Sequence, residues 1–352
     1  MNINYERTKV NYKRFIKLDD KKLNILILGA GNSDIERCNI INPVNINNAL
    51  ELFGESDLFN AYKYAKDITN DYNVYVCNCT TNTDYITVSD KIIQYEFDYI
   101  VPVSIYLSDT FYNPITKQYE YYTNYFLNVL KEVNSIATLI MTDKHASLYE
   151  DIDFFLNDMR IKYKSYINNK DTLNILSKSG SNLVLVYNML NNISHANIIV
   201  AAMLASNTGY TYPSNVDYYP TYDLDKNDII NSNFVYFKYN YLTNNTSAEN
   251  LLNLRTINDI YKNILINELI KKVIKIVDLN EYRGKLYTNY TQLQIANKIK
   301  LLLNPYKNVL FLDYKINNIN FVKTAPGVGY IYVELSISPY SSIDNINLVM
   351  EV

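Results

Sequence analysis

The stretch GYIYVELSISPYSSIDNINLVMEV, residues 329–352, decides how we interpret this chain. Apolar and polar residues alternate on both sides of Ser338-Pro339-Tyr340, and this period of two predicts two β-strands joined by a turn. Each strand places its aliphatic side chains on one face: Ile331, Val333, Leu335 and Ile337 in the first, and Ile346, Leu348 and Met350 in the second. A strand at the end of a chain has an unpaired edge, which can recruit another chain. This stretch therefore predicts assembly rather than catalysis.

The composition predicts a folded protein of two domains. A chain of 352 residues exceeds one average domain. Hydrophobic residues make up 48% and charged residues 20%, which is ample for a core. The net charge of -3 gives no basic footprint, so we expect no nucleic acid as a partner. Because the sequence has no run of about 18 apolar residues, we expect no membrane insertion.

The cysteines and histidines predict neither a metal site nor an active site. The chain has three cysteines, Cys38, Cys77 and Cys79, and only His145 and His195 to assist them, so we expect reduced thiols and no zinc. His145 lies in a polar turn and is expected to be a solvated loop residue, and His195 is expected to cap the helix that follows it. The first residues lack an apolar segment, so no signal peptide is expected and a cytosolic protein is predicted.

Strand and helix patterns alternate along the first two thirds of the chain, which favours an α/β architecture. We expect strands over 23–28, 74–77, 99–104, 137–141, 183–187 and 234–239, and helices over 49–53, 58–68, 124–133, 148–164 and 198–205. Asn47 or Asn48 is the expected cap of the first helix and Gly54 its end. A long loop is expected over 207–233, and two more helices over 256–277 and 291–303.

The best enzyme signal is the turn Gly29-Ala30-Gly31 after the first strand, which resembles the first motif of class I methyltransferases. Asp34 stands where a dinucleotide-binding fold has its third glycine, and the next strand carries no acid to bind a ribose. We therefore interpret the turn as the end of a strand. A soluble methyltransferase-like enzyme remains the alternative function.

Several segments, taken in order, resemble contractile tail sheath proteins of phages and phage-tail-like particles. They are 24–32 (NILILGAGN), 42–54 with its Asn-Pro and its Phe-Gly, the helix and strand over 58–77, 197–214 (NIIVAAMLASNTGYTYPS), Leu254-Arg255, and 330–352. The chain departs from the family in having Thr256 where a second Arg is usual, and in its low glycine content. It is also too short to carry the decorating outer domains of larger sheaths.

The resemblance implies a two-domain α/β (α+β) fold. An inner mixed α/β domain with exchanged terminal strands would consist of an N-terminal arm, 1–22, and of 245–352. An outer α/β domain, 23–244, would be inserted between them. The arms would add strands to neighbouring subunits, with contacts at Ile3, Tyr5, Ile346, Leu348 and Met350.

The resemblance also implies a function. The chain would be a structural subunit, without enzymatic activity or a cofactor, that polymerises helically around an inner tube. Contraction would drive that tube through a target envelope. Its partners would be its own copies, the tube protein, and baseplate and tail terminator proteins. It would be made in the host bacterial cytoplasm and end in a virion tail or a tail-like particle.

Two helices are candidates for the contact with the tube, and the sequence does not decide between them. One is the later turns of 256–277, with Lys271, Lys272 and Lys275, although cations near a helix C-terminus are also favoured by the helix dipole. The other is the face of 291–303 with Lys298 and Lys300.

Overall fold

The computed structural model describes residues 22–32, 37–68, 72–114, 116–132, 137–176, 182–191, 193–206, 219–222, 224, 234–240, 245–250, 264–282, 286–325, 328–338 and 346–351. Their contacts divide the chain into a larger unit, which includes 12–207 and 211–264, and a smaller unit, which includes 265–352. We describe each unit by itself.

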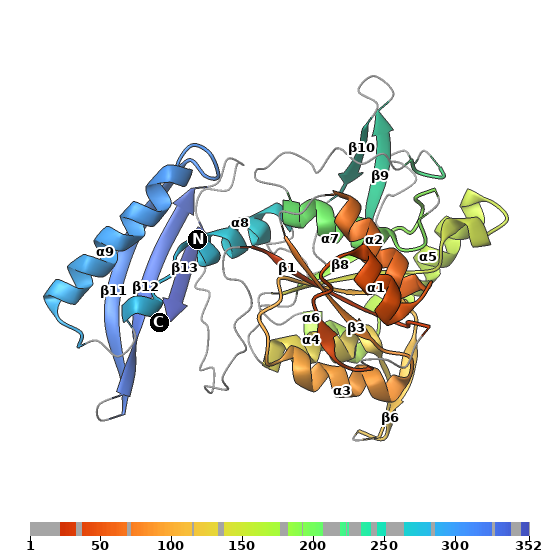
Figure 1. Ribbon diagram of the computed structural model, residues 1–352, viewed down its shortest axis with the longest axis horizontal. Coiled ribbons are helices and arrows are strands. Elements are labelled where there is room, and N and C mark those ends of the chain that lie inside the picture. The colour runs from red at the N-terminus through yellow and green to blue at the C-terminus, as the bar shows by residue number, and fades with distance from the viewer. Residues whose placement is uncertain are drawn as a thin grey trace. The chain divides into compact units, whose positions relative to one another are not determined.

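The larger unit is built on an eight-stranded sheet with the order β10-β9-β8-β7-β4-β1-β3-β2 (Figure 1). The six central strands run parallel, whereas the short strands at the two edges, β2 and β10, pair antiparallel. Their bounds are β1 Asn24–Gly29, β2 Ile40–Ile41, β3 Asn73–Asn78, β4 Tyr99–Pro102, β7 Thr138–Thr142, β8 Leu183–Val186, β9 Phe234–Asn240 and β10 Asn245–Glu249. Central parallel strands are covered on both faces, which explains why β1, β7 and β8 are continuous apolar runs.

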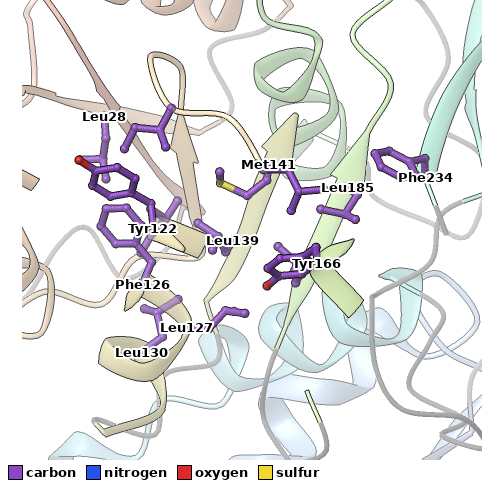
Figure 2. Packing of buried hydrophobic residues seen from close by; sticks show 14 of the residues in the cluster. Leu28, Tyr122, Phe126, Leu127, Leu130, Leu139, Met141, Tyr166, Leu185 and Phe234 are labelled. Atoms are coloured by element: carbon purple, nitrogen blue, oxygen red, sulfur yellow. The ribbon is translucent and has the colours of Figure 1, made fainter. Parts of the chain in front are cut away.

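Helices cover both faces of this sheet. Figure 1 shows α1 (Ile46–Phe53), α2 (Asp57–Ile68) and α7 (Ala196–Ser206) on one side, and α3 (Asn82–Ile92), α4 (Tyr122–Glu132) and α6 (Lys170–Leu176) on the other. The core on the second side also takes buried residues from α5 (Ile152–Ile167). Figure 2 shows how Leu28, Leu139, Met141 and Leu185 of the sheet meet aromatic rings such as Tyr122, Phe126 and Tyr166. The remaining elements are a hairpin, β5 (Thr110–Asn113) and β6 (Gln118–Tyr121), and a 3-10 turn, Ala146–Leu148.

The smaller unit combines two helices with a three-stranded antiparallel sheet. The helices are α8 (Ile264–Ile276) and α9 (Asn289–Leu303), and the sheet has the order β11 (Asp313–Ala325), β12 (Val328–Ser338), β13 (Ile346–Glu351) (Figure 1). Two 3-10 turns, Asn280–Tyr282 and Asn304–Tyr306, flank α9. The predicted alternation in β12 is confirmed, because all four aliphatic residues on its predicted inner face are buried: Ile331, Val333, Leu335 and Ile337. On α9, the residues Ile295, Ile299 and Leu303 are buried as well.

The structure confirms the α/β fold class and corrects the predicted start of the first helix. The first helix is capped by Asn45, whose side chain accepts a hydrogen bond from the Asn48 N–H at 2.9 Å, and not by Asn47 or Asn48. The helix therefore begins at Ile46, directly after its cap. Gly54 ends it as predicted, with φ of 62°. β9 and β10, which lie on either side of the predicted boundary at 244/245, pair with each other in the larger unit. The predicted division into an inner and an outer domain stays a prediction. Residues 256–263 and most of 207–233 lie outside the described residues.

Candidate functional site

The glycine turn after β1 uses its backbone donors within the protein. The Ala30 N–H donates to Ser104 Oγ at 2.9 Å, and the Gly31 N–H donates to Asn78 Oδ1 at 2.9 Å. In a nucleotide-binding turn such amides point at the ligand instead. Here two side chains of the protein satisfy them.

The space at the two glycines is also filled by the protein. A Cβ atom added to Gly29 would lie 2.4 Å from Cγ2 of Val103, and one added to Gly31 would lie 3.2 Å from the Asn78 amide. Real Cβ atoms do not approach other atoms as closely as the first of these distances. The glycines therefore allow close packing of the end of β1 against Asn78, the last residue of β3, and Val103, which follows β4. This agrees with the interpretation of the turn as the end of a strand.

The three cysteines are free thiols, and two of them are fully buried. Cys77 Sγ and Cys79 Sγ lie 3.9 Å apart, and their hydrogen bond, together with burial, raises the pKa of Cys79. Burial, and then the hydrogen bond to Asp84, raises the pKa of Cys38 to about 11. The thiols of Cys38 and Cys79 are therefore protonated at neutral pH and are poor nucleophiles and poor metal ligands. Among the described residues no group of His, Cys, Asp or Glu could hold a metal ion.

The two histidines play different roles from those expected. His145 is bound within the fold, with Nε2 2.9 Å from the Leu190 carbonyl oxygen and Nδ1 accepting from the Ser147 N–H. The side chain of His195 does not cap α7: it is 2% exposed, and Nε2 lies 3.7 Å from Oδ2 of Asp57. The Ala196 N–H donates to Asn188 Oδ1 instead. The capping prediction was wrong because the residue that caps α7 lies earlier in the chain.

Asp84, near the N-terminus of α3, is held by several donors. The Arg37 Nε–H donates to it at 2.9 Å, and the N–H groups of Thr80 and Thr81 each donate at 2.8 Å. Burial alone would raise the pKa of Asp84, but these hydrogen bonds outweigh it and hold the pKa well below its ordinary value. A carboxylate at a helix N-terminus is also favoured by the helix dipole. This cluster stabilises the start of α3.

A second charged cluster joins the end of β7 to α5. Lys162 Nζ lies 2.7 Å from the buried Asp143 and 2.9 Å from Asp158. Burial alone would lower the pKa of Lys162, but the hydrogen bonds to the two carboxylates outweigh it and raise the pKa. Because each charge is neutralised by a partner within the fold, this cluster has a structural role and offers no free acid or base.

The lysines that are candidates for the contact with the tube differ in their solvent exposure. Lys271 is buried and pairs with Glu268 at 3.0 Å, so in this structure it is not a surface contact. Burial lowers the pKa of Lys272, and Lys275 is half-buried. On α9, Lys298 pairs with Glu281 at 3.5 Å, and Lys300 is exposed.

The outer face of α9 carries large apolar residues that sequence reasoning missed. Tyr290, Leu293 and Leu301 are 70%, 63% and 70% exposed. Leu293 comes three residues after Tyr290, and Leu301 comes eight residues after Leu293. At the period of an α-helix, this spacing places all three on one side of α9. The sequence could have predicted this exposed apolar face. If Ile295 and Ile299 mark the buried side of the helix, its period places Tyr290, Leu293 and Leu301 outside that side. Among the described residues, a groove of about 760 Å³ runs between α9 and β11 and is lined by Lys300, Lys307 and Lys315, among others.

The predicted arm residues are described only in part. Ile3 and Tyr5 lie outside the described residues. Ile346, Leu348 and Met350 lie on β13, whose backbone pairs with β12 of the same chain, Ile346 opposite Ile337 and Leu348 opposite Leu335. Their side chains lie outside what the structure describes, so their predicted contacts with other subunits stay a prediction. No helix in the described ranges is long and apolar enough to cross a membrane.

The fold is the one found in contractile sheath proteins. Neither a protein-family model nor a curated protein sequence matches the chain. Among solved structures, it is similar to a chain of the PVC sheath complex of an extracellular contractile injection system in its contracted state. That pair shares 11% identity over 99% of this chain and 97% of that one, with a TM-score of 0.64.

Two further structures show the same similarity. The sheath tail protein of Listeria innocua is 11% identical over 94% of this chain and 95% of its own, with a TM-score of 0.60. A chain of the helical sheath of the anti-feeding prophage in its contracted state is 8% identical over 99% and 97%, with a TM-score of 0.57. At these identities the comparison establishes the fold, and it spans both units of the chain.

Proposed function

We propose that this chain is the structural subunit of a contractile tail sheath. Copies polymerise helically around an inner tube, and contraction of the polymer drives the tube through a target envelope. The observation that carries this proposal is the extent of the structural match. It covers 99% of this chain and 97% of a sheath chain, so it takes in both units of the chain.

The charged and thiol clusters of the larger unit support a structural rather than an enzymatic role. The carboxylate of Asp84 and the ammonium group of Lys162 are bound by partners within the fold. The amides of the Gly29–Gly31 turn, the part of the chain on which a methyltransferase would depend, donate to Ser104 and Asn78. We found no observation that favours the methyltransferase alternative.

The partners follow from the proposed role. They are other copies of this chain, the inner tube protein, and the baseplate and tail terminator proteins at the two ends of the polymer. The subunit is made in the bacterial cytoplasm and assembles into a virion tail or a phage-tail-like particle. The division into an inner domain, 1–22 with 245–352, and an outer inserted domain, 23–244, is part of the same proposal.

The exposed face of α9 is the better candidate for the contact with the tube. It presents Tyr290, Leu293, Leu301 and Lys300 to solvent, whereas on α8 Lys271 is buried and paired. Exposed apolar residues beside a cation suit a surface that becomes covered by another protein.

Negative-stain electron microscopy of the purified chain, alone and with its tube protein, tests the proposal. We expect rings or helical tubes with cogwheel cross-sections. A parallel titration with an adenosyl cofactor, followed by calorimetry, should give no binding heat. A monodisperse particle that binds the cofactor and forms no tubes with the tube protein would overturn the proposal in favour of the enzyme.

A further inference from the structure

The helix α1 of the larger unit carries an exposed apolar face that is bordered by acids. Ile46 and Leu50, one helical turn apart, are both exposed, and Val44, just before the helix, is 88% exposed. Glu51 and Glu55 are exposed beside them, and neither side chain has an ion pair within the described part of the chain. From Val44 to Glu55 the sequence contains no Lys or Arg, so this face is acidic.

The helix α5 carries a second exposed apolar face, which is bordered by cations. Phe154 and Ile161 are 59% and 57% exposed, and their spacing of seven residues places them on one side of the helix. Arg160 and Lys164 are exposed next to Ile161, and among the described residues neither forms an ion pair. The acids of α5 all lie before Arg160, so the later turns of this face are basic.

The two faces lie on opposite sides of the larger sheet and toward its opposite ends. α1 packs against α2, which lies over β1 and β3 on one side (Figure 1). On the other side, Phe155 and Tyr163 of α5 contact the rings of Tyr187, directly after β8, and Phe234 of β9. Two strands, β7 and β4, separate β8 from β1 in the sheet. The two exposed faces therefore do not cover each other within one chain.

Charge decides which of these faces suit each other in an assembly. Two α1 faces would bring carboxylates together, and two α5 faces would bring cations together, so each face disfavours a second copy of itself. An α1 face and an α5 face are complementary, because apolar side chains meet apolar ones and the acids meet the cations. A contact between unlike faces is heterologous, so it continues from copy to copy and does not stop at a dimer.

We propose that the α1 face of one copy binds the α5 face of the next copy, and that this contact joins the larger units in the polymer. The inference rests on the proposed sheath function and adds to it the surfaces through which the larger units meet. Large apolar side chains that are exposed on the free subunit become covered in the assembly.

Reversal of the charges on each face tests the inference. Glu51→Lys/Glu55→Lys should raise the concentration of protein needed for tube formation at least about tenfold, because it places like charges in contact. Arg160→Glu/Lys164→Glu should do the same for the other face. The chain with all four substitutions has complementary faces again, so it should form tubes within about threefold of the wild-type concentration. Sedimentation of a dilution series, with negative-stain microscopy of the pellets, measures this.

A matched variant controls for net charge. Asp90→Lys/Glu96→Lys makes the same change in charge at exposed residues of α3 and of the segment after it, and it should form tubes as the wild type does. Circular dichroism shows which variants are folded. Tubes at the wild-type concentration from either double variant, or a folded fourfold variant that does not recover, would overturn the inference while the sheath function stands. If the unmodified chain forms no tubes even with its tube protein, the sheath function fails, and the inference fails with it.

Discussion

At the scale of single residues, the fold depends on charges that the chain neutralises internally. Asp84 shows this best, because its carboxylate accepts hydrogen bonds from a guanidinium group and from two backbone N–H groups at the start of α3. Its pKa lies below its ordinary value of 3.8 in the folded state. A carboxyl group with a lowered pKa stabilises the fold above the pKa of the unfolded chain, and this contribution is lost as the pH falls through the folded value.

We expect Asp84→Asn to lower the free energy of unfolding at pH 7 by about 2 kcal/mol, because it removes the charge from these hydrogen bonds. The difference from the unmodified protein should shrink as the pH falls below 4, since the wild-type carboxylate then begins to lose its own contribution. Urea unfolding of both proteins at pH 7 and at pH 3 measures this.

Asp90→Asn on the same helix is the control. Asp90 is exposed, so its variant should lie within about 0.5 kcal/mol of the wild type at both pH values. A difference for Asp84→Asn that stayed constant with pH would show that the carboxylate charge is not what stabilises the helix start.

At the scale of elements, apolar patterns predicted the strands well, because a strand that is buried on both faces consists of consecutive apolar residues. β1, β7 and β8 are short apolar runs, and Ile331 to Ile337 alternate as β12 requires. The failures involve contacts between segments. Helical spacing does not reveal what covers a helix, so the burial of Lys271 could not be foreseen. The same limit applies to the capping of α7 by Asn188 rather than by His195.

The exposed face of α9 yields a prediction of its own. We expect the double variant Leu293→Ser/Leu301→Ser to fold normally and to bind the tube protein at least about tenfold more weakly. Each buried leucine contributes roughly 1.5–3 kcal/mol, and 1.4 kcal/mol corresponds to about a tenfold change in affinity. Co-sedimentation with preformed tubes of the tube protein measures the loss.

Leu148→Ser, at a residue of the larger unit that is 71% exposed, should bind tubes as the wild type does. The competing candidate is α8. Tube binding that survives the α9 variant but is abolished by Lys272→Ser/Lys275→Ser would assign the contact to α8 instead.

At the scale of the whole molecule, removal of residues 345–352 should separate folding from assembly. The truncated chain lacks β13, so we expect it to keep the far-ultraviolet circular dichroism and the unfolding transition of the larger unit, and to form no tubes by itself. Its vacant β12 edge can still accept a strand from an intact copy. Small amounts mixed with the full-length chain should therefore shorten the tubes, as measured by microscopy.

Normal tubes from the truncated chain alone would show that the terminal strand is not needed for assembly. Tubes of unchanged length in the mixture would show that the β12 edge does not accept strands from other copies.

The bulged, capped β11 strand sets a limit on how copies can be connected. Its register is interrupted between Ile316 and Asn318, and the carbonyl oxygen of Ile319 already accepts hydrogen bonds from Gln292 and Tyr287. Such an edge is a poor template for a further strand, so the sheet is protected from growing on this side into a continuous fibril-like ribbon.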